Sequence, residues 1–594
     1  MQLHSLDWII AFLSVAVCFV PALFFGKRSG KSTAEFFASG RSVPWWLAGI
    51  SMVATTFSSD TPNLVANFVR TQGVAGNWQW WAFTLTGVST VFFFARLWRR
   101  SGVLTDLEFY ELRYSGKAAS AVRGFRAVYL GLFFNCIIMA TVNLAACKIA
   151  AILFGLPRWE TLLAVGLLNV IFATHSGLWG VLVIDMIQFF IKMSAVIAAA
   201  YFAVTLPQVG GLSGMVDKLS HVRGPGGLNY LSLLPDFTNN WDLAVAVFII
   251  PIAIQWWSVW YPGAEPGGGS YIAQRMLASK SEKDALGGTL FFNVAHYVLR
   301  PWPWILVGLC SLIVYPQLSD IQKAFPNLDP KLLGHDIAYP AMLRFLPAGW
   351  IGLMLGGLIA ANSSTILTHL NWGASYLVHD FYRRFITRDA TEKHYVKAGR
   401  YATVLLFVLS SAMVFALDTA KDSFNLLLAV GAGTGLLYIL RWFWWRINAW
   451  CEIVAMISSF AVALIFLILA KNGVVYGFSQ QLIIGVALTT VSWVAAAYLS
   501  PQTDDRVLIG FYEKVRPFGP GWRRIQAKSS SPVVEGDNYP LALLGWIMGV
   551  TMIWSALFTV GNFLYGRTNY ALILGVIFVI SGSIVIQVVK KLWK

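Results

Sequence analysis

The sequence predicts an all-α polytopic membrane protein, and three observations lead to this fold class: its hydropathy, its low charge and its recurring apolar stretches. Of its 594 residues, 57% are hydrophobic and 12% are charged, and the mean hydropathy is +0.64. Soluble domains usually carry about 25% charged residues. Apolar stretches of about 20 residues, enough to cross a hydrocarbon core of about 30 Å, recur along the whole chain. The composition argues against a soluble enzyme, a secreted disulfide scaffold and a disordered regulator.

The apolar stretches predict about 15 transmembrane helices. Their approximate spans are residues 7–26, 43–69, 77–98, 120–154, 159–175, 178–205, 241–262, 284–314, 341–370, 398–417, 423–441, 448–470, 479–499, 541–563 and 569–589. Residues 1–500 then form a transmembrane core with flanking helices. Residues 501–540 form a cytoplasmic loop, and residues 541–594 form two additional C-terminal transmembrane helices.

The basic residues are unevenly distributed in a chain whose formal net charge is +16 at pH 7. Most of the 44 Lys and Arg residues lie in alternate loops between the spans. The positive-inside rule places those loops in the cytoplasm of a multi-pass protein of the cell inner (plasma) membrane. The N-terminus is then outside and the C-terminus is cytoplasmic, which requires an odd number of spans. The basic charge therefore reports orientation, and we expect no nucleic-acid partner.

Two of the predicted spans are interrupted by their own composition. The second span carries a polar run from Thr55 to Thr61 followed by Pro62, which has no backbone N–H and disfavours helix before it. The seventh span ends in a Gly/Pro-rich segment, residues 262–269. Unwound backbone at membrane depth is tolerated where it is buried in protein or lines a cavity, and paired broken helices indicate a transporter's binding site. The five-helix spacing between the two breaks predicts a five-plus-five inverted repeat.

Several segments carry a family resemblance. They are TAEFFASGRSVPWWLAGISMVATTFSS (33–59), LTDLEFYELRYSG (104–116), SGLWGVLVIDMIQ (176–188), YIAQRMLASKSEKDA (271–285) and HDFY (379–382). In the same order they resemble segments of the sodium/solute symporter family, which contains bacterial sugar, proline and sialic-acid transporters. The resemblance covers roughly residues 7–500. It implies a leucine-transporter-like fold, a five-plus-five inverted repeat with extra N- and C-terminal helices.

The resemblance also implies a site for sodium (Na+), the expected coupling ion. Sodium is a hard cation that oxygen atoms hold best, and a broken helix supplies free carbonyls at the negative end of a half-helix dipole. The carbonyl oxygens would come from Ala54, Phe57 and Ala361, and the hydroxyl oxygens from Ser364 and Thr365. In the alternative interpretation, these hydroxyls bond back to their own helix or join two helices.

A second sodium site is implied by Asp185, Ser364 and Thr368. A carboxylate within a membrane span is a functional candidate because a charge in hydrocarbon is unfavourable. The chain departs from the family pattern at Leu367, where a serine is expected. The alternative, in which Asp185 caps or bonds a neighbouring helix, stays open.

For the solute, the resemblance and the polar character of the two breaks predict seven binding residues: Asp60, Thr61, Gln79, Gln255, Trp257, Ser258 and Arg300. Amide and indole groups suit a small polar solute, since indoles stack on one face while amides bond its edge. The neighbouring tryptophans Trp78, Trp80 and Trp81 are expected in the aromatic belt at the membrane surface.

Arg300 is the strongest anomaly, because it is a charge within the eighth span. Three interpretations are open: Arg300 clamps a solute carboxylate, it pairs with Asp60 or Glu265, or it snorkels to the membrane surface. Pairing is the favoured one. For Lys192 and His369 we expect buried partners or interface contacts and assign no role.

Together these patterns predict a sodium-coupled secondary active symporter that imports a small polar solute (a sugar, polyol, amino acid or carboxylate) by alternating access. No covalent chemistry is needed, so we do not expect an enzyme. The expected partners are the solute, sodium and the lipid bilayer, and the chain is expected to function as a monomer. The alternatives are a membrane solute sensor or receptor, a channel of the same fold and a membrane enzyme.

Overall fold

Apolar helices fill the structure, a computed structural model that describes residues 3–24, 31–417, 420–529 and 538–592. Within these ranges no strand forms beyond two isolated bridges, Val43 with Ser279 and Val259 with Ala432. The all-α prediction is therefore confirmed.

The helices up to the middle of the chain are α1 (Ser5–Leu23), α3 (Thr33–Ala38), α4 (Trp45–Thr55), α5 (Asp60–Gln72), α6 (Trp78–Trp81), α7 (Thr84–Ser89), α8 (Ala95–Ser101), α9 (Glu108–Arg113), α10 (Gly116–Val128), α11 (Asn135–Phe154), α12 (Arg158–Val204), α13 (Gly211–Ser220), α14 (Trp241–Ala244), α15 (Trp256–Ser258), α16 (Ser270–Ala278) and α17 (Glu282–Val294). Those that follow are α18 (Pro301–Val314), α19 (Leu318–Ala324), α20 (Ala338–Met342), α21 (Trp350–Ser375), α22 (Glu392–Met413), α23 (Ala420–Gly431), α24 (Gly435–Phe443), α25 (Ala449–Lys471), α26 (Phe478–Leu499), α27 (Asp505–Val515), α28 (Arg523–Gln526), α29 (Tyr539–Leu564) and α30 (Thr568–Leu592).

Ten helices of the described residues are long and apolar enough to cross a membrane by themselves. The other predicted spans coincide with shorter or interrupted helices, which are α1, α4 with α5, α6 to α8, the first part of α12, and α23 with α24. Within α12, Gly177 has a non-helical backbone (φ 58°, ψ −164°) between the predicted fifth and sixth spans. The count of fifteen crossings stays a prediction.

The predicted break in the second span lies between α4, which ends at Thr55, and α5, which begins at Asp60. Pro62 falls in the first turn of α5, where its missing N–H leaves no helical bond unmade. In the seventh span the helix ends at Ser258, the backbone at Val259 is extended, and α16 begins only at Ser270.

A further break that the sequence did not reveal separates α23 from α24 at residues 432–434. Its backbone pairs with the break of the seventh span: the Trp260 N–H donates to the Gly431 carbonyl (3.1 Å), and the Gly433 N–H donates to the Ser258 carbonyl (2.8 Å). Each irregular segment thus satisfies polar groups of the other, as buried non-helical backbone requires.

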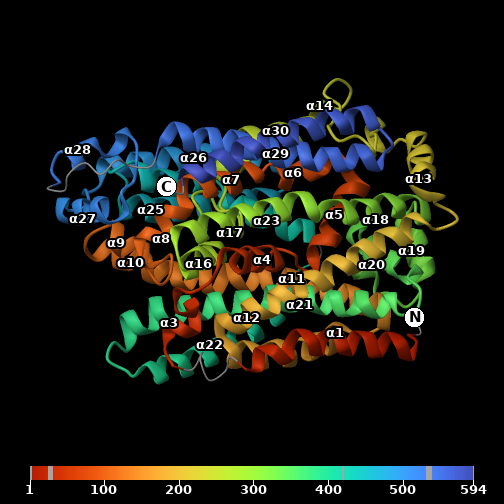
Figure 1. Cartoon of the computed structure of the whole chain (residues 1–594), viewed down its shortest axis with the longest axis horizontal. Coiled ribbons are helices and arrows are strands. Elements are labelled where there is room, and N and C mark those ends of the chain that lie inside the picture. The colour runs from red at the N-terminus through yellow and green to blue at the C-terminus, as the bar shows by residue number, and fades with distance from the viewer. Residues whose placement is uncertain (1–2, 25–30, 418–419, 530–537, 593–594) are drawn as a thin grey trace.

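The long helices run between two ends of the molecule (Figure 1). α1 begins at the end where α13 and α19 lie, and α30 finishes toward the opposite end, where α9, α27 and α28 lie. The basic residues Arg113, Lys117 and Arg523 belong to elements of that opposite end. This arrangement agrees with an odd number of crossings, whereas the side that faces the cytoplasm stays a prediction.

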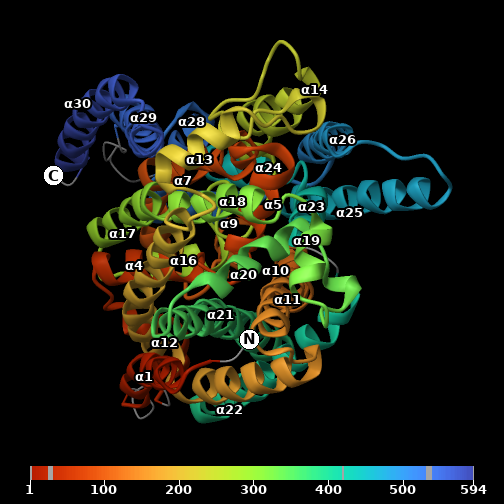
Figure 2. The ribbon, with the colours of Figure 1, turned by 90° about the vertical axis from the view of Figure 1, so that its right-hand side faces the viewer.

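The C-terminal segments attach to the core through tryptophan side chains. α29 and α30 stand at the edge of the bundle (Figure 2), where the Trp546 indole N–H donates to the Leu85 carbonyl (2.9 Å). The predicted loop 501–540 is more ordered than expected: it contains α27 and α28, and Trp522 donates to the Trp442 carbonyl (2.7 Å). Part of this loop, residues 530–537, lies outside the described residues.

The N-terminal helix α1 caps α21, the helix that carries the predicted sodium hydroxyls. The Asp7 carboxylate accepts hydrogen bonds from the Gly349 and Gly352 N–H groups (2.6 and 3.2 Å), which are unpaired donors at a helix start. The backbones approach so closely that a Cβ at Gly352 would lie 2.4 Å from the Asp7 carbonyl oxygen. α1 is therefore part of the core that positions α21.

We expect Gly352→Ala to lower the free energy of unfolding by about 1–3 kcal/mol, because the added methyl group overpacks the α1–α21 contact. Thermal unfolding of the purified protein in detergent measures the change. Gly510→Ala in α27 is the matched control, since a Cβ there meets no atom within 4 Å. Equal melting temperatures for the two variants would contradict this account of α1.

Candidate functional site

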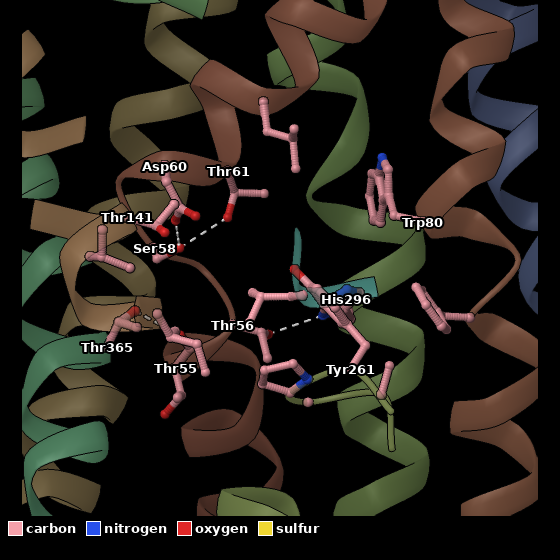
Figure 3. Close-up of a pocket in the computed structure, with 18 of the residues that line it drawn as sticks. Thr55, Thr56, Ser58, Asp60, Thr61, Trp80, Thr141, Tyr261, His296 and Thr365 are labelled. Carbon is pink, nitrogen blue, oxygen red and sulfur yellow. Dashed lines mark hydrogen bonds between the residues drawn. The ribbon is translucent and has the colours of Figure 1, made fainter. Parts of the chain in front are cut away.

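A cavity of about 120 Å³ lies beside the break between α4 and α5 (Figure 3). Polar side chains of the break, among them Ser58, Asp60 and Thr61, line one side. Trp80, Tyr261 and His296 lie across the cavity from them. Three of the predicted solute residues, Asp60, Thr61 and Arg300, therefore line a common space.

The acidic side of the cavity is built by the first turn of α5. Asp60 is the first residue of this helix, where the positive end of the helix dipole stabilises a carboxylate. The Ser58 hydroxyl donates to the Asp60 carboxylate and lies 3.1 Å from the Thr61 hydroxyl. The break thus holds Asp60 in a fixed orientation.

The basic side of the cavity is built by Arg300, whose side chain is fully buried. Its guanidinium donates to the Val53 carbonyl (3.4 Å), the Thr56 hydroxyl (3.2 Å) and His296 Nδ1 (2.5 Å). An arginine only donates, so His296 Nδ1 is the acceptor and carries no proton.

Two interpretations of Arg300 are wrong. It does not snorkel, because it is buried among α4 and the eighth span. It also does not pair with Asp60 or Glu265, since within the described residues its acceptors are two backbone carbonyls, a hydroxyl and an imidazole. The clamp for a solute carboxylate stays a prediction.

Aromatic side chains form much of the remaining wall. Phe83 stacks on Tyr261 with ring centroids 5.4 Å apart, and Trp80 stacks on Tyr297 at 5.9 Å. Trp78 and Trp81 are buried against α29 instead, so the predicted aromatic belt is wrong for these tryptophans. Sequence reasoning missed Tyr261, Tyr297 and His296, whose contribution appears only when the spans are packed.

The other predicted solute residues do not line this cavity. Gln255 donates to the Gln79 carbonyl (2.7 Å), and Gln79 in turn donates to Gln72 (2.7 Å). Trp257 donates to the Ala253 carbonyl of its own helix (2.8 Å), and Ser258 is buried where the two later breaks meet. Their amide and indole groups are used to join backbone segments, and their role in solute binding stays a prediction.

The five positions predicted for sodium lie at the α4–α5 break (Ala54 and Phe57) and on α21 (Ala361, Ser364 and Thr365), and whether sodium binds them stays a prediction. The Thr365 hydroxyl donates to the Thr55 carbonyl (2.7 Å), and the Ser364 hydroxyl donates to Asp185 (2.6 Å). The carbonyl oxygens of Ala54 and Phe57 point at one place, and that place holds the ammonium of Lys192. Lys192 Nζ lies 2.9 Å from the Ala54 oxygen and 3.2 Å from the Phe57 oxygen. The carbonyl pair therefore does not fit a sodium ion while this ammonium binds it.

The second predicted sodium position also has a cation of the protein beside it. The Asp185 carboxylate accepts hydrogen bonds from Ser51 (2.5 Å) and Ser364 (2.6 Å), and the Arg275 guanidinium lies 3.7 Å from it. The same guanidinium donates to the Thr368 hydroxyl (2.8 Å). Asp185 therefore serves as the counter-ion of Arg275 and joins α12 to α4 and α21. Sodium binding at this position stays a prediction.

Comparisons with known proteins agree with this architecture. Residues 36–489 match the sequence profile of the sodium:solute symporter family. The chain belongs to the sodium:solute symporter family. This membership confirms the resemblance, sodium-coupled symport as the function class and sodium as the coupling ion of that class.

Relatives in the family cover most of the chain. The sodium/glucose cotransporter of Vibrio parahaemolyticus is 26% identical over 496 residues, which are 81% of this chain and 87% of the relative. The sodium/sialic acid symporter of Aliivibrio fischeri is 24% identical over 477 residues, 77% of this chain and 87% of the relative. A solved Na+-coupled sialic acid symporter in a substrate-bound outward-open state is 19% identical. Its TM-score is 0.65 over 85% of this chain and all of that chain, which shows a shared fold.

We expect Asp185→Asn to lower the free energy of unfolding by about 3–5 kcal/mol, since it leaves the buried Arg275 without its counter-ion. The double variant Asp185→Asn/Arg275→Gln is expected to recover part of this loss. Thermal unfolding in detergent measures both, with Asp505→Asn, at an exposed ion pair, as the control. The single variant Arg275→Gln is measured as well. The pairing is refuted if the double variant loses as much free energy of unfolding as the two single variants together.

Proposed function

We propose that this symporter imports a small zwitterionic solute of the amino-acid or betaine class. Its carboxylate would bind Arg300, and its cationic group would lie between Asp60 and the aromatic wall. One observation carries the proposal: Arg300 is fully buried beside the cavity, and no carboxylate of the described residues pairs with it.

A buried guanidinium favours a planar anion as its partner. Its present acceptors are neutral, and charge-assisted bonds to a carboxylate are about twice as strong as neutral ones. Leaving a charge buried without a counter-charge is unfavourable, so a solute carboxylate would relieve this condition. A neutral sugar, the solute named for the Vibrio relative, offers no such compensation.

The opposite side of the cavity suits a cation. Asp60 supplies a carboxylate there, and Trp80 and Tyr261, which lie across the cavity from it, supply with Tyr297 aromatic faces that attract ammonium groups through their quadrupoles. The two charged ends of a zwitterion would then match the two sides of the cavity. The volume of about 120 Å³ restricts the solute to a small one.

We also propose the finer topology that the sequence predicts: the N-terminus outside, the C-terminus cytoplasmic, and a monomer that is a transporter and not an enzyme. The gathering of basic residues at the end with α9, α27 and α28 supports the orientation. A sensor, a channel and a membrane enzyme are the alternatives, and uptake measurements separate them from a symporter.

The solute class can be tested by stabilisation and uptake. We expect a small amino acid or betaine to raise the melting temperature in NaCl, because a ligand at 100 times its Kd stabilises the folded state by about 2.7 kcal/mol. Glucose, which lacks both charges, and acetate, which lacks the cationic one, should leave it unchanged. Proteoliposomes with an inward sodium gradient should then accumulate the stabilising solute. Stabilisation by glucose alone would refute the zwitterion proposal, and gradient-independent equilibration would indicate a channel.

Arg300→Gln is expected to weaken binding of the zwitterion about 10- to 100-fold, since it removes charge-assisted bonds. Asp60→Asn should weaken it by a similar factor, while binding of an analogue without the cationic group should change little. Isothermal titration of each purified variant measures the affinities. Thr551→Val, which removes an exposed hydroxyl bonded only within α29, is the control. Unchanged affinity in both charge variants would place the solute elsewhere.

A further inference from the structure

We propose that the ammonium of Lys192 takes the place of sodium at the carbonyl site between α4, α5 and α21. The chain would then carry a covalently attached cation where the family pattern implies a dissociable one. The proposal concerns this ion site alone and does not depend on the solute.

The geometry around Lys192 is that of a cation in a carbonyl cage. Nζ donates to the oxygens of Ala54 (2.9 Å) and Phe57 (3.2 Å), two carbonyls at the helix break. The Ala54 oxygen also accepts the Phe57 N–H (3.2 Å), so the ammonium uses its second lone pair. Phe57 also turns its ring toward Nζ, with the ring centroid 5.5 Å away. A single positive charge therefore sits at the negative end of the α4 half-helix, as a sodium ion would.

The hydrogen-bond acceptors of Lys192 among the described residues are backbone carbonyls. The side chain is 1% exposed, and within the described residues no carboxylate comes within ion-pair distance of Nζ. The nearest acid along α12, Asp185, is paired with Arg275 and bonded by Ser51 and Ser364. The backbone oxygens of the break are thus the principal partners of this buried charge.

The site has no room for a second cation. Beside the ammonium lies a cavity of about 10 Å³, lined by Phe57, Lys192 and Ala361 among others, which is no larger than one water molecule needs. A unit charge about 4 Å away would lower the affinity for sodium about 1,000-fold at an effective dielectric constant of about 20. The ammonium and a sodium ion therefore exclude each other.

A tethered cation changes what the site does in transport. A sodium ion leaves its ligands when the site opens to the cytoplasm, whereas Lys192 remains part of α12. The Lys192 ammonium would hold the α4–α5 break against α12, and no sodium ion would enter the cell through this contact. Any sodium that drives uptake would then bind elsewhere in the chain.

Equilibrium binding of 22Na+ to the purified full-length protein tests the proposal without any solute. We expect Lys192→Met to bind one more sodium per chain than the wild type, because the long apolar side chain frees both carbonyls without filling the cage with charge. Adding Thr365→Ala to this variant should abolish the extra site, since Thr365 supplies a predicted hydroxyl ligand. The same substitution in the wild type should leave the sodium count unchanged.

Lys218→Met in α13 is the matched control, because it removes an exposed lysine whose ammonium meets only the Gln208 carbonyl. Equal sodium counts for Lys192→Met and the wild type would overturn the proposal. If Lys192→Met does not fold, the single variant Thr365→Ala is compared with the wild type. Loss of a bound sodium in Thr365→Ala would show that sodium already occupies the cage and would overturn the proposal. If the proposed solute class is wrong, the melting temperatures measured with the different solutes would show it. The number of sodium ions bound per chain would not change.

Discussion

The structure depends on how the carbonyl groups at the end of α4 are satisfied. The break after Thr55 interrupts the regular helical bonding of these carbonyls, so that Ala54 keeps only a turn bond from the Phe57 N–H (3.2 Å), and under-satisfied carbonyls at membrane depth are unfavourable. Three other spans supply the missing donors as side chains. Arg300 reaches the Val53 oxygen, Lys192 reaches those of Ala54 and Phe57, and Thr365 reaches that of Thr55. One interrupted helix therefore fixes the relative positions of the sixth, eighth and ninth spans and places the solute cavity among them.

The pairing of the buried charged side chains around the break is a second constraint on the site. Around the break lie three buried cations, Lys192, Arg275 and Arg300, and three acids, Asp60, Asp185 and Glu265. Asp185 is used by Arg275, and Asp60 is held by Ser58 on the far side of the cavity. Lys192 and Arg300 therefore have no carboxylate partner among the described residues. In our proposal an anionic group of the solute gives Arg300 a counter-charge, whereas a second cation at the carbonyl cage would be repelled by Lys192. The solute proposal and the ion-site proposal share this cause, although each can fail without the other.

The sequence predicted the fold class well because hydropathy is a local property, and it located the second-span break because Pro62 and the polar run before it are local signals. The α23–α24 break was missed, since its small residues around Gly433 interrupt neither hydropathy nor charge. The family resemblance and residue type predict Gln79 and Gln255 at the solute, yet each has a backbone or amide partner that only the packing reveals. No role could be predicted for Lys192, because its partners are backbone carbonyls, which every residue has and which no residue type indicates.

The hydroxyl residues of α21 show why a family motif does not decide which cation a site holds. Thr365 ties α21 to the Thr55 carbonyl, and Ser364 orients the Asp185 carboxylate that neutralises Arg275. Each hydroxyl therefore makes a hydrogen bond that stabilises the fold without sodium. Its presence is compatible with a sodium ion or with the Lys192 ammonium at the carbonyls. The residue that discriminates lies outside the motif, seven positions after Asp185 on α12, where a side chain must be long and charged to reach the break. A non-polar residue there would leave the Ala54 and Phe57 carbonyls to a mobile ion, and a lysine fills them from within the chain.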